Sequence, residues 1–357
     1  MKMRAARMYG YNEPWRLEEI PVPELGRDEV LIKVAATGMC RSDFQLVEGY
    51  FQAAAPIEFP ITPGHEIAGH VAGRGAEVPA SAGLSEGDLV VVNPGWGDGT
   101  CRQCHEGNEQ MCTGTGGWPG FGPPGGFAEY VAVPHRQLIR VPAGDSQQPE
   151  NFAPLTDAGL TPYRGVKKLS AAGKLGPGRT VVVAGIGGLG SYAVQYAKLL
   201  GAGATVVGFS RTDDKLEVAR RNGADHTVNT RGKSAGQVQD ELERLTGRRA
   251  VDAVLDCTGA KESIALDFAI LGSEGAVVAV GLMGTQVEVP LNFIVGGELQ
   301  FLGSFWGNYN DLTEVLALAA AGRIEHTVTA VRLDEINENL QALGRGDVVG
   351  RRVVVFD

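Results

Sequence analysis

Cysteine is scarce in this chain, and its distribution argues against a disulfide framework. Only five cysteines occur among 357 residues, too few to cross-link so long a chain. Three of them crowd into one short segment, as Cys101, Cys104 and Cys112. Such clustering is typical of a metal site.

Long apolar runs and an excess of positive charge are also missing. No apolar segment of about 18 residues occurs, and no apolar stretch follows the basic start of the chain, so we expect a cytoplasmic protein with no membrane partner. The formal net charge is −10. Proteins that bind nucleic acids concentrate Lys and Arg on one face, so we expect no nucleic-acid partner either.

The length of the chain exceeds the size at which a single core usually stops growing, which predicts two domains. Up to about residue 158 the sequence has short strands between turn signals, including 29–36 and 89–92. From Thr180 onward, strands alternate with helices, which is typical of a parallel, doubly wound α/β sheet. The strands predicted there are 180–184, 204–209, 250–255 and 275–280, and the helices are one ending near 200, then 215–222 and 262–271. A helix at 311–321 and a strand at 352–356 follow.

A glycine motif follows the first strand of that second region. Gly185, Gly187 and Gly190 fit the pattern G-x-G-x-x-G, with Gly188 and Leu189 between them. The glycines allow a tight turn and a close approach to pyrophosphate, and the start of the next helix faces the phosphates. The alternative is a glycine-rich turn without a ligand, but the strand-to-helix context favours a dinucleotide site.

The clustered cysteines provide three thiolates on one loop, and Asp98 lies three positions before Cys101. A closed tetrahedral Zn²⁺ site needs four protein donors, and an aspartate oxygen can be the fourth. We therefore predict a structural zinc held by Asp98, Cys101, Cys104 and Cys112. The alternative is three buried thiols that are close only in sequence.

A second group of candidate residues is dispersed, and spacing alone does not join its members: Cys40, Ser42, Asp43, His65, Glu66 and Asp157. Here the order of several segments and the residues within them resemble those of the zinc-dependent medium-chain alcohol dehydrogenases. The matching segments are 38–43, 64–66, 101–112, 125–130, 185–190 and 251–259. The resemblance covers essentially the whole chain, and it implies a GroES-like, mostly β catalytic domain at 1–158, a Rossmann domain at 159–303 and a return segment at 304–357 that completes the first domain.

The resemblance also implies roles for the dispersed residues. Cys40, His65 and Asp157 become the ligands of a catalytic zinc, with the fourth position open for water or substrate. Asp43 would orient His65, and Glu66 would be a carboxylate close to the metal. Cys257 is expected to be a small core residue of the Rossmann domain. The histidines 70, 105, 135, 226 and 326 match no catalytic position.

The implied reaction is a reversible hydride transfer between an alcohol and NAD(P), through a zinc-bound alkoxide. Ser42 would accept the alcohol proton and pass it toward the cofactor ribose. Many relatives end this relay at a histidine, but Gln45 stands at that position here and cannot titrate. The route by which the proton leaves stays open.

The cofactor is predicted to be NADP in preference to NAD. An NAD site normally has a carboxylate at the end of the second strand, and this strand ends in Ser210 and Arg211, which can bind a 2′-phosphate. The alternative is that Asp213 or Asp214 reaches the ribose. Lys215 is a further candidate, and the resemblance puts Arg41 and Arg351 at the pyrophosphate, unless they are surface arginines.

For the substrate pocket we consider Trp96, Phe305 and Trp306, although aromatic residues are more often part of a core. A homotetramer is expected by resemblance, with the apolar stretch 287–303 as a contact across a two-fold axis. A polyol or sugar dehydrogenase of the same superfamily and a non-catalytic zinc-stabilised binding protein remain as alternative functions.

Overall fold

The computed structural model describes residues 1–53, 56–114, 116–143 and 148–356. Its contacts divide the chain into two compact units. The first contains Met1–Ala158 and Gly307–Asp357, and the second contains Gly159–Trp306. The chain therefore leaves the first unit once and returns to it.

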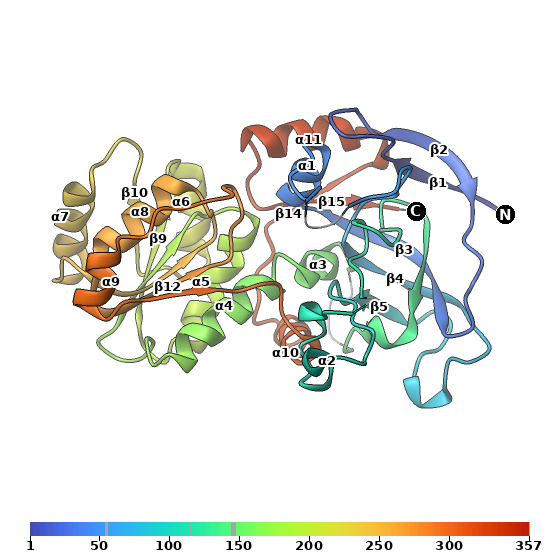
Figure 1. The fold of residues 1–357 in the computed structure, drawn as a ribbon, viewed down its shortest axis with the longest axis horizontal. Helices are drawn as coiled ribbons and strands as arrows, with labels where there is room; N and C mark the ends of the chain where they lie inside the picture. Colours follow the sequence, from blue (N-terminus) through green and yellow to red (C-terminus); the bar gives the residue numbers. More distant parts are fainter. Residues whose placement is uncertain (54–55, 115, 144–147, 357) are drawn as a thin grey trace. The chain divides into compact units, whose positions relative to one another are not determined.

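The first unit is built on a seven-stranded sheet (Figure 1) with the order β14-β15-β3-β4-β5-β7, in which β6 pairs with β3. Every pair in this sheet is antiparallel except β14 with β15. A separate ribbon joins β1 to β2. The strands are β1 Lys2–Arg7, β2 Arg16–Pro21, β3 Glu29–Met39, β4 Glu66–Arg74, β5 Leu89–Val92, β6 Tyr130–Pro134, β7 Leu138–Arg140, β14 Val328–Val331 and β15 Arg351–Val355.

Short helices connect these strands. The α-helices are α1 Arg41–Val47, α2 Arg102–His105, α3 Pro149–Phe152, α10 Tyr309–Ala320 and α11 Ile336–Arg345. The 3₁₀ turns are η1 Ala80–Ala82, η2 Glu109–Met111, η3 His135–Gln137, η4 Ala153–Thr156 and η5 Leu333–Glu335.

The core of the first unit follows from alternation along β3. Val30, Ile32 and Val34 point inward at every second position, because successive side chains of a strand face opposite sides of the sheet. They pack with Ile67 of β4 and Val90 of β5. Strand β15 pairs with β3, so residues 351–355 complete a sheet whose earliest strand is β3.

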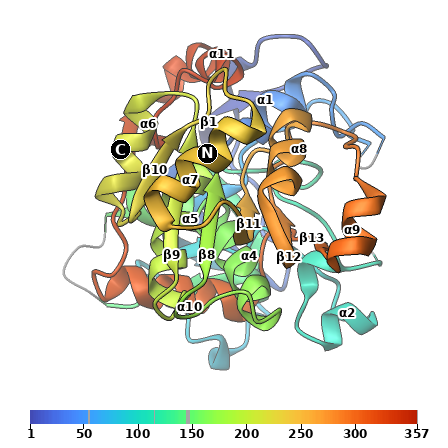
Figure 2. The ribbon, with the colours of Figure 1, turned by 90° about the vertical axis from the view of Figure 1, so that its left-hand side faces the viewer.

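The second unit contains a six-stranded parallel sheet with the order β10-β9-β8-β11-β12-β13. Figure 2 shows this order across the sheet, from β10 to β13. Its strands are β8 Thr180–Ala184, β9 Thr205–Ser210, β10 His226–Asn229, β11 Val251–Asp256, β12 Leu271–Ala279 and β13 Gln300–Gly303. Its helices are α4 Leu160–Ala171, α5 Gly188–Leu200, α6 Asp213–Arg221, α7 Ala235–Thr246, α8 Lys261–Ile270 and α9 Leu291–Gly297.

The strand order is that of a dinucleotide-binding Rossmann sheet, with β8 as the first strand in sequence and its neighbours added on both sides. Strands β8 and β11 are buried at every position, as expected where helices cover both faces of a parallel sheet. The predicted α/β fold with a second, mostly β domain is confirmed. Among the helices of the described residues, none combines the length and apolar character needed to span a bilayer.

Candidate metal and cofactor sites

Three polar side chains from distant segments converge in the first unit. Cys40 immediately precedes α1, His65 immediately precedes β4, and Asp157 follows η4. The Cys40 Sγ lies 3.2 Å from the Asp157 Oδ2, and the His65 Nε2 lies 3.5 Å from the same oxygen. One donor atom from each of these residues and one from Glu66 lie within 4.8 Å of one another. We refer to Cys40, His65 and Asp157 as the dispersed centre.

The pairing of β3 with β4 explains why two of these segments meet. Gly38, near the end of β3, lies opposite Glu66, the first residue of the antiparallel strand β4. Cys40 and His65 therefore lie at the same edge of the sheet. A side chain at Gly38 would place its Cβ only 1.7 Å from the Glu66 Oε2. Gly64, with φ +103°, makes the turn into His65, and a Cβ there would lie 2.9 Å from the backbone nitrogen of Phe127.

Asp43 fixes the positions of both Cys40 and His65. Its Oδ2 accepts a hydrogen bond from the Cys40 backbone N–H at 2.7 Å, and its Oδ1 lies 3.5 Å from the His65 Nδ1. A carboxylate facing Nδ1 favours the proton on that nitrogen, which leaves Nε2 to act as a metal ligand. Burial lowers the pKa of His65, but the charge of Asp43 and hydrogen bonds with Asp157 and Asp43 raise it well above its usual value.

Glu66 and Arg351 form a buried ion pair beside the dispersed centre. The Arg351 guanidinium donates from Nε to both oxygens of Glu66, at 3.1 and 3.0 Å, and from Nη2 to the Asp157 Oδ2 at 3.0 Å. Burial raises the pKa of Glu66 to about 7, although the positive charge of Arg351 opposes this rise. Burial also raises the pKa of Asp157, but its hydrogen bond with His65 and the charges of His65 and Arg351 hold that pKa well below its usual range.

The dispersed centre fits a zinc ion. Zn²⁺ binds sulfur at about 2.3 Å and nitrogen or oxygen at about 2.0–2.2 Å, so two ligands of one tetrahedral ion lie about 3.3–3.8 Å apart. The separations of 3.2 and 3.5 Å around Asp157 are close to that range. One thiolate and one carboxylate also balance the charge of the ion. Three protein donors leave a coordination position for a small molecule.

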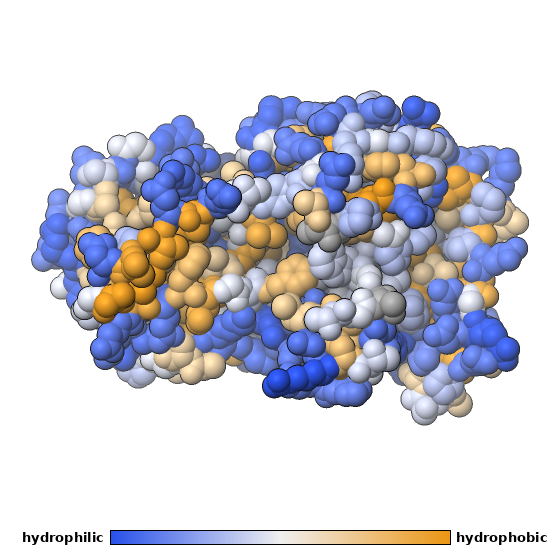
Figure 3. Space-filling model, in the orientation of Figure 1, coloured by the Kyte–Doolittle hydropathy of each residue, from blue (hydrophilic) through white to orange (hydrophobic). Residues whose placement is uncertain are grey.

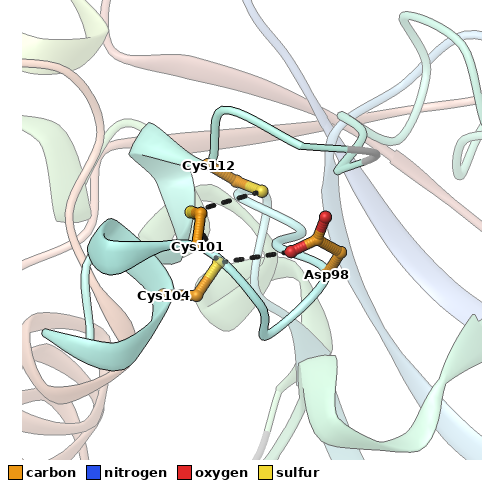
Figure 4. Close-up of side chains that lie close together, drawn as sticks. All are labelled: Asp98, Cys101, Cys104 and Cys112. Carbon is orange, nitrogen blue, oxygen red and sulfur yellow. Dashed lines mark hydrogen bonds between the residues drawn. The ribbon is translucent and has the colours of Figure 1, made fainter.

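The cysteine loop holds a second group of donors, shown in Figure 4. The Cys101 Sγ lies 3.5 Å from the Cys104 Sγ and 3.9 Å from the Cys112 Sγ, and the Cys104 Sγ lies 3.9 Å from the Asp98 Oδ1. All four residues can offer donor atoms within 4.8 Å of one another. The spacing fits a closed tetrahedral zinc with four protein ligands. The histidines 70, 105, 135, 226 and 326 belong to neither group of donors.

The two thiols of α2 and its cap differ in acidity. A hydrogen bond from the backbone of Thr113 lowers the pKa of Cys101 to about 6, and burial raises the pKa of Cys104 to about 11. A metal ion binds thiolates, so Cys104 must lose a proton when zinc binds near neutral pH.

An aromatic pocket of about 260 Å³ lies in the first unit. Its walls include Trp96, Trp118 and Phe121, and the Phe121 ring lies 5.3 Å from the His65 ring. The pocket is therefore next to the dispersed centre. Trp96 is a predicted substrate residue, and that role stays a prediction. The sequence gives no signal for Trp118 and Phe121, because single aromatic residues in a glycine-rich loop carry no recognisable spacing. The other predicted aromatic residues, Phe305 and Trp306, lie in the second unit with their ring centroids 4.6 Å apart.

The glycine motif forms the turn between β8 and α5. Gly185 has φ +88°, and a Cβ at Gly190 would lie 2.0 Å from the Gly185 carbonyl oxygen, so both positions need glycine. Gly187 caps the start of α5, and Gly188 and Leu189 form its first turn. The backbone N–H groups at the start of a helix bind phosphate groups.

The end of β9 lacks a carboxylate, as the sequence indicated. Ser210 is the last, buried residue of the strand, and Arg211 is exposed. The Asp213 Oδ1 accepts a hydrogen bond from Asn229 at 2.8 Å, and the Asp214 Oδ1 accepts one from the Lys215 backbone N–H at 2.8 Å. Both aspartates, at the start of α6, therefore already accept hydrogen bonds from nearby protein groups.

The two arginines predicted at the pyrophosphate have protein partners in the first unit. Arg41 donates from Nη1 to the carbonyl oxygens of Leu343 and Gly344, near the end of α11, at 2.9 and 3.1 Å. Arg351 is the buried partner of Glu66 and Asp157. Their contact with a cofactor stays a prediction.

Comparison with known proteins places these sites in a family. Residues 26–143 match the model of the alcohol dehydrogenase GroES-like domain, and residues 188–321 match the model of zinc-binding dehydrogenases. A protein of Sulfurisphaera tokodaii described as an NAD-dependent alcohol dehydrogenase is 38% identical over 99% of this chain and 100% of its own length. The D-arabinose 1-dehydrogenase (NADP(+)) of Saccharolobus solfataricus is 33% identical over 99% of this chain and 98% of its own.

A solved structure gives the same result. The alcohol dehydrogenase of Aeropyrum pernix superimposes with a TM-score of 0.91 at 36% identity, covering 99% of this chain and 100% of that one. A Rossmann sheet joined to a GroES-like unit with two zinc-type donor sets defines a medium-chain dehydrogenase. The chain belongs to the zinc-dependent alcohol dehydrogenases of this superfamily, and it is an oxidoreductase that uses a nicotinamide cofactor. The predicted family and reaction class are confirmed.

Proposed function

We propose that this enzyme oxidises bulky or aromatic alcohols, and reduces the corresponding carbonyls, with NADP as the preferred cofactor. The observation that carries the proposal is the convergence of Cys40, His65 and Asp157 beside an aromatic pocket. We assign these three residues to a catalytic zinc and the cysteine loop to a structural zinc. Held by Cys40, His65 and Asp157, a zinc ion would act as a Lewis acid and lower the pKa of an alcohol hydroxyl group.

Ser42 is the residue we assign to proton transfer. Its Oγ lies 3.4 Å from the His65 Nε2, at the edge of the donor cluster. A hydroxyl group there can accept a proton from the alcohol and donate its own onward. Gln45 is buried and cannot titrate, so the proton must reach solvent through the cofactor ribose or through water.

Asp43 and Glu66 act on the ligands and not on the substrate. Asp43 holds the His65 ring so that Nε2 faces Asp157. Glu66 holds Arg351 in an ion pair, and Arg351 donates to Asp157, which keeps that carboxylate ionised and oriented. Removing either partner of such a buried pair leaves an uncompensated charge.

The pocket supports a choice of substrate class. Its aromatic side chains at Trp96, Trp118 and Phe121 favour apolar substituents. Glu109 and Gln110 also line the pocket and can bind a hydroxyl group, so the choice of substrate class rests on the aromatic contacts. A sugar dehydrogenase is the second candidate, since one relative acts on D-arabinose.

A single assay tests the reaction and the substrate class together. We expect benzyl alcohol to produce NADPH absorbance at 340 nm, with much lower efficiency for D-arabinose, and we expect the activity to disappear after chelation and return with zinc. A Trp118→Ala variant should lower the efficiency for benzyl alcohol more than that for ethanol. Higher efficiency for D-arabinose would favour the sugar dehydrogenase, and activity that is unaffected by complete removal of metal would overturn the zinc mechanism.

The NADP preference rests on the end of β9. Ser210 and the exposed Arg211 stand where an NAD site has a carboxylate, and Asp213 has a partner in Asn229. An arginine hydrogen bond to a phosphate contributes about 1.5–3 kcal/mol, which corresponds to roughly a tenfold to hundredfold preference for NADP. Lys215, at the start of α6, can add positive charge near the same phosphate.

Comparing catalytic efficiency with the two cofactors tests this assignment. Arg211→Ala should remove most of the preference, and Arg221→Ala, which changes an exposed arginine of α6, should leave it unchanged. A clear preference of the unaltered enzyme for NAD, as the names of several relatives state for those proteins, would overturn the assignment.

We also propose that the enzyme self-associates through the edge of the Rossmann sheet. Strand β13 is the last strand of the sheet, and the adjacent α9 exposes Leu291, Phe293 and Val295 at 70%, 62% and 70%. Figure 3 shows apolar residues gathered over this helix. A second copy of the chain would cover them and pair the strand edge.

Sedimentation tests the association. We expect an assembly larger than a monomer, with a tetramer as the predicted form, and Phe293→Asp should dissociate it. A monomer at working concentration in the unaltered protein would refute the proposal. The cytoplasmic location stays a prediction.

A further inference from the structure

Helix α8 buries an aspartate that has no hydrogen-bond donor. Asp267 has no exposed surface, and neither of its carboxyl oxygens has a hydrogen-bond partner among the described residues. An ionised carboxylate in that position would lose its hydration without compensation, which is strongly unfavourable.

The group that faces Asp267 is another buried carboxyl, that of Asp256 at the end of β11. Helix α8 packs on β11, β12 and α7. The buried residues that β12 and α7 contribute are apolar, namely Ala276, Val277, Val278, Val238 and Leu242. Among the described residues, the Cys257 thiol is the other titratable group that interacts with the pair.

Asp256 already has the donors that a carboxylate needs. It accepts hydrogen bonds from the Thr258 N–H at 2.9 Å, the Thr258 hydroxyl at 3.0 Å, the Ser263 hydroxyl at 2.6 Å and the Gly259 N–H. Asp256 therefore suits the ionised member of the pair. Asp267, which has no donor, suits the protonated member.

We propose that Asp267 is a neutral carboxylic acid in the folded enzyme and donates a hydrogen bond to Asp256, so that the pair positions the turn 256–259 against the dinucleotide loop. The proton comes from solvent when the chain folds. One proton shared between the two carboxyl groups leaves a single negative charge. Five groups donate to it, namely the four donors to Asp256 and the protonated Asp267, so no buried cation is needed.

The turn that the pair holds lies against the first glycine of the loop. Asp256 lies opposite Ala184 in the register of β8 and β11, and the Cys257 N–H donates to the Ala184 carbonyl oxygen at 2.8 Å. The Thr258 Cγ2 would lie only 2.3 Å from a Cβ at Gly185, so the threonine fills the space beside that glycine. Asp256 holds Thr258 through both its N–H and its hydroxyl. Asp267 is thus a positioning residue, two steps from the cofactor.

The direction of the pH dependence follows from the burial of Asp267. Burial, and after it the charge of Asp256, raises the pKa of Asp267 well above its usual value. The unfolded chain loses this proton near pH 4, whereas the folded chain keeps it. Between these two pKa values, the ratio of folded to unfolded protein falls about tenfold for each unit by which the pH rises, as far as this one group is concerned.

The Asp267→Asn variant tests whether Asp267 holds a proton or only fills space in the core. A carboxamide has nearly the same shape and donates at every pH. We expect the melting temperature of D267N, minus that of the unaltered enzyme, to increase steadily from pH 5 to pH 9. Glu262→Gln, which changes an exposed carboxylate on the same helix, should show a constant difference. A constant difference for D267N as well would overturn the proposal.

An infrared measurement tests the protonation state without relying on a variant that folds. The unaltered enzyme at neutral pH should show the carbonyl band of a protonated carboxylic acid, shielded from exchange, and the band should be missing in D267N and present in E262Q. Absence of the band from the unaltered enzyme would also overturn the proposal.

The positioning role rests on the proposed cofactor site, and dinucleotide binding tests it separately. NADPH fluorescence should give the same Kd for D267N as for the unaltered enzyme, and a Kd at least severalfold higher for D267A, which has no donor. Equal binding by D267A would refute the positioning role. Gly190→Ala distinguishes failure of the positioning role from an incorrect cofactor site. If G190A binds NADPH normally, the glycine loop is not the cofactor site. The infrared band would still report the protonated carboxyl pair in that case.

Discussion

The two groups of metal donors in the first unit are built in opposite ways. The cysteine loop takes all its donors from residues 98–112, whereas the dispersed centre joins Cys40 to Asp157 across 117 positions. The loop offers four protein donors. The dispersed centre offers three, because the nearby Glu66 carboxylate is engaged in an ion pair with Arg351. A closed site stabilises a local fold, and an open site can act on a substrate. The number of protein donors and the sequence distance between their segments therefore favour a structural role for the loop and a catalytic role for the dispersed centre.

The largest expected difference between the two centres is in activity. Asp157→Ala should lower alcohol oxidation by more than about a hundredfold and reduce bound zinc from about two ions per chain to about one, because two remaining ligands hold the metal poorly. Asp98→Ala is the matched change in the loop, and the fraction that folds should keep most of its turnover. Kinetics together with metal analysis would check both. Full activity with full metal in D157A would show that the ligand assignment is wrong.

The opposite difference is expected in stability. Cys104→Ser should lower the melting temperature by more than about 5 °C, since a closed zinc site contributes folding free energy. The turnover of the remaining folded enzyme should change little. Met111→Ser, at a side chain that is 49% exposed on the same loop, serves as the control. A C104S variant that melts normally but has lost turnover would contradict a structural role.

Two glycines allow a smaller test of how tightly each centre is packed. A Cβ at Gly38 would lie 1.7 Å from the Glu66 Oε2 and 3.0 Å from the Glu66 Cβ, and one at Gly114 would lie 1.9 Å from the Asp98 Oδ2. Glu66 is fully buried and cannot move aside, so Gly38→Ala should cost about 1–3 kcal/mol of stability and also reduce activity. Gly114→Ala should cost less, because Asp98 is only half-buried. Denaturant unfolding of both variants would measure the difference, and a larger cost for G114A would reverse the expected order.

The smallest effect concerns protons released on metal binding. Zinc affinity of the loop should rise with pH near neutrality, because Cys104, with a pKa of about 11, must lose its proton. Below about pH 6 the dependence should become steeper by one proton, since Cys101 is then protonated as well. The dispersed centre should show no such break from Asp157, whose pKa lies well below its usual range. Competition with a chromophoric chelator across this pH range would reveal the break at pH 6, and a uniform slope would contradict the acidity assigned to Cys101.

Elements with strong local patterns were predicted closely. Strands 89–92 and 180–184 coincide with β5 and β8, because continuous apolar residues between turn signals leave few alternatives. Strand β10 and helix α7 were not predicted. Helix α7 buries only Val238 and Leu242, too narrow a stripe to recognise, and β10 has one fully buried residue, Val228. Strand β10 is fixed by its pairing with β9. Helix α7 does carry a local signal that was missed, namely the capping box of Ser234 and Gln237 at its start and Gly247 at its end.

The helix and strand near residue 271 show the limit on boundaries. The sequence predicted a helix over 262–271 and a strand from 275, but α8 ends at Ile270 and β12 begins at Leu271. Leu271 suits either element by itself. Its pairing with Val251 of β11 decides the matter, because a parallel strand is formed by its neighbour's hydrogen bonds.

The sequence by itself determined what lies within a few residues: the cysteine loop, the glycine turn and the missing carboxylate after β9. For the dispersed centre it supplied the residues only through a resemblance, since no spacing connects Cys40, His65 and Asp157. The tertiary structure decided that these three meet, that Glu66 occupies the space a side chain at Gly38 would need, and that Asp267 faces Asp256. The physical reason is that donor distances and burial are properties of the packed chain, which strand register brings about and local patterns do not encode.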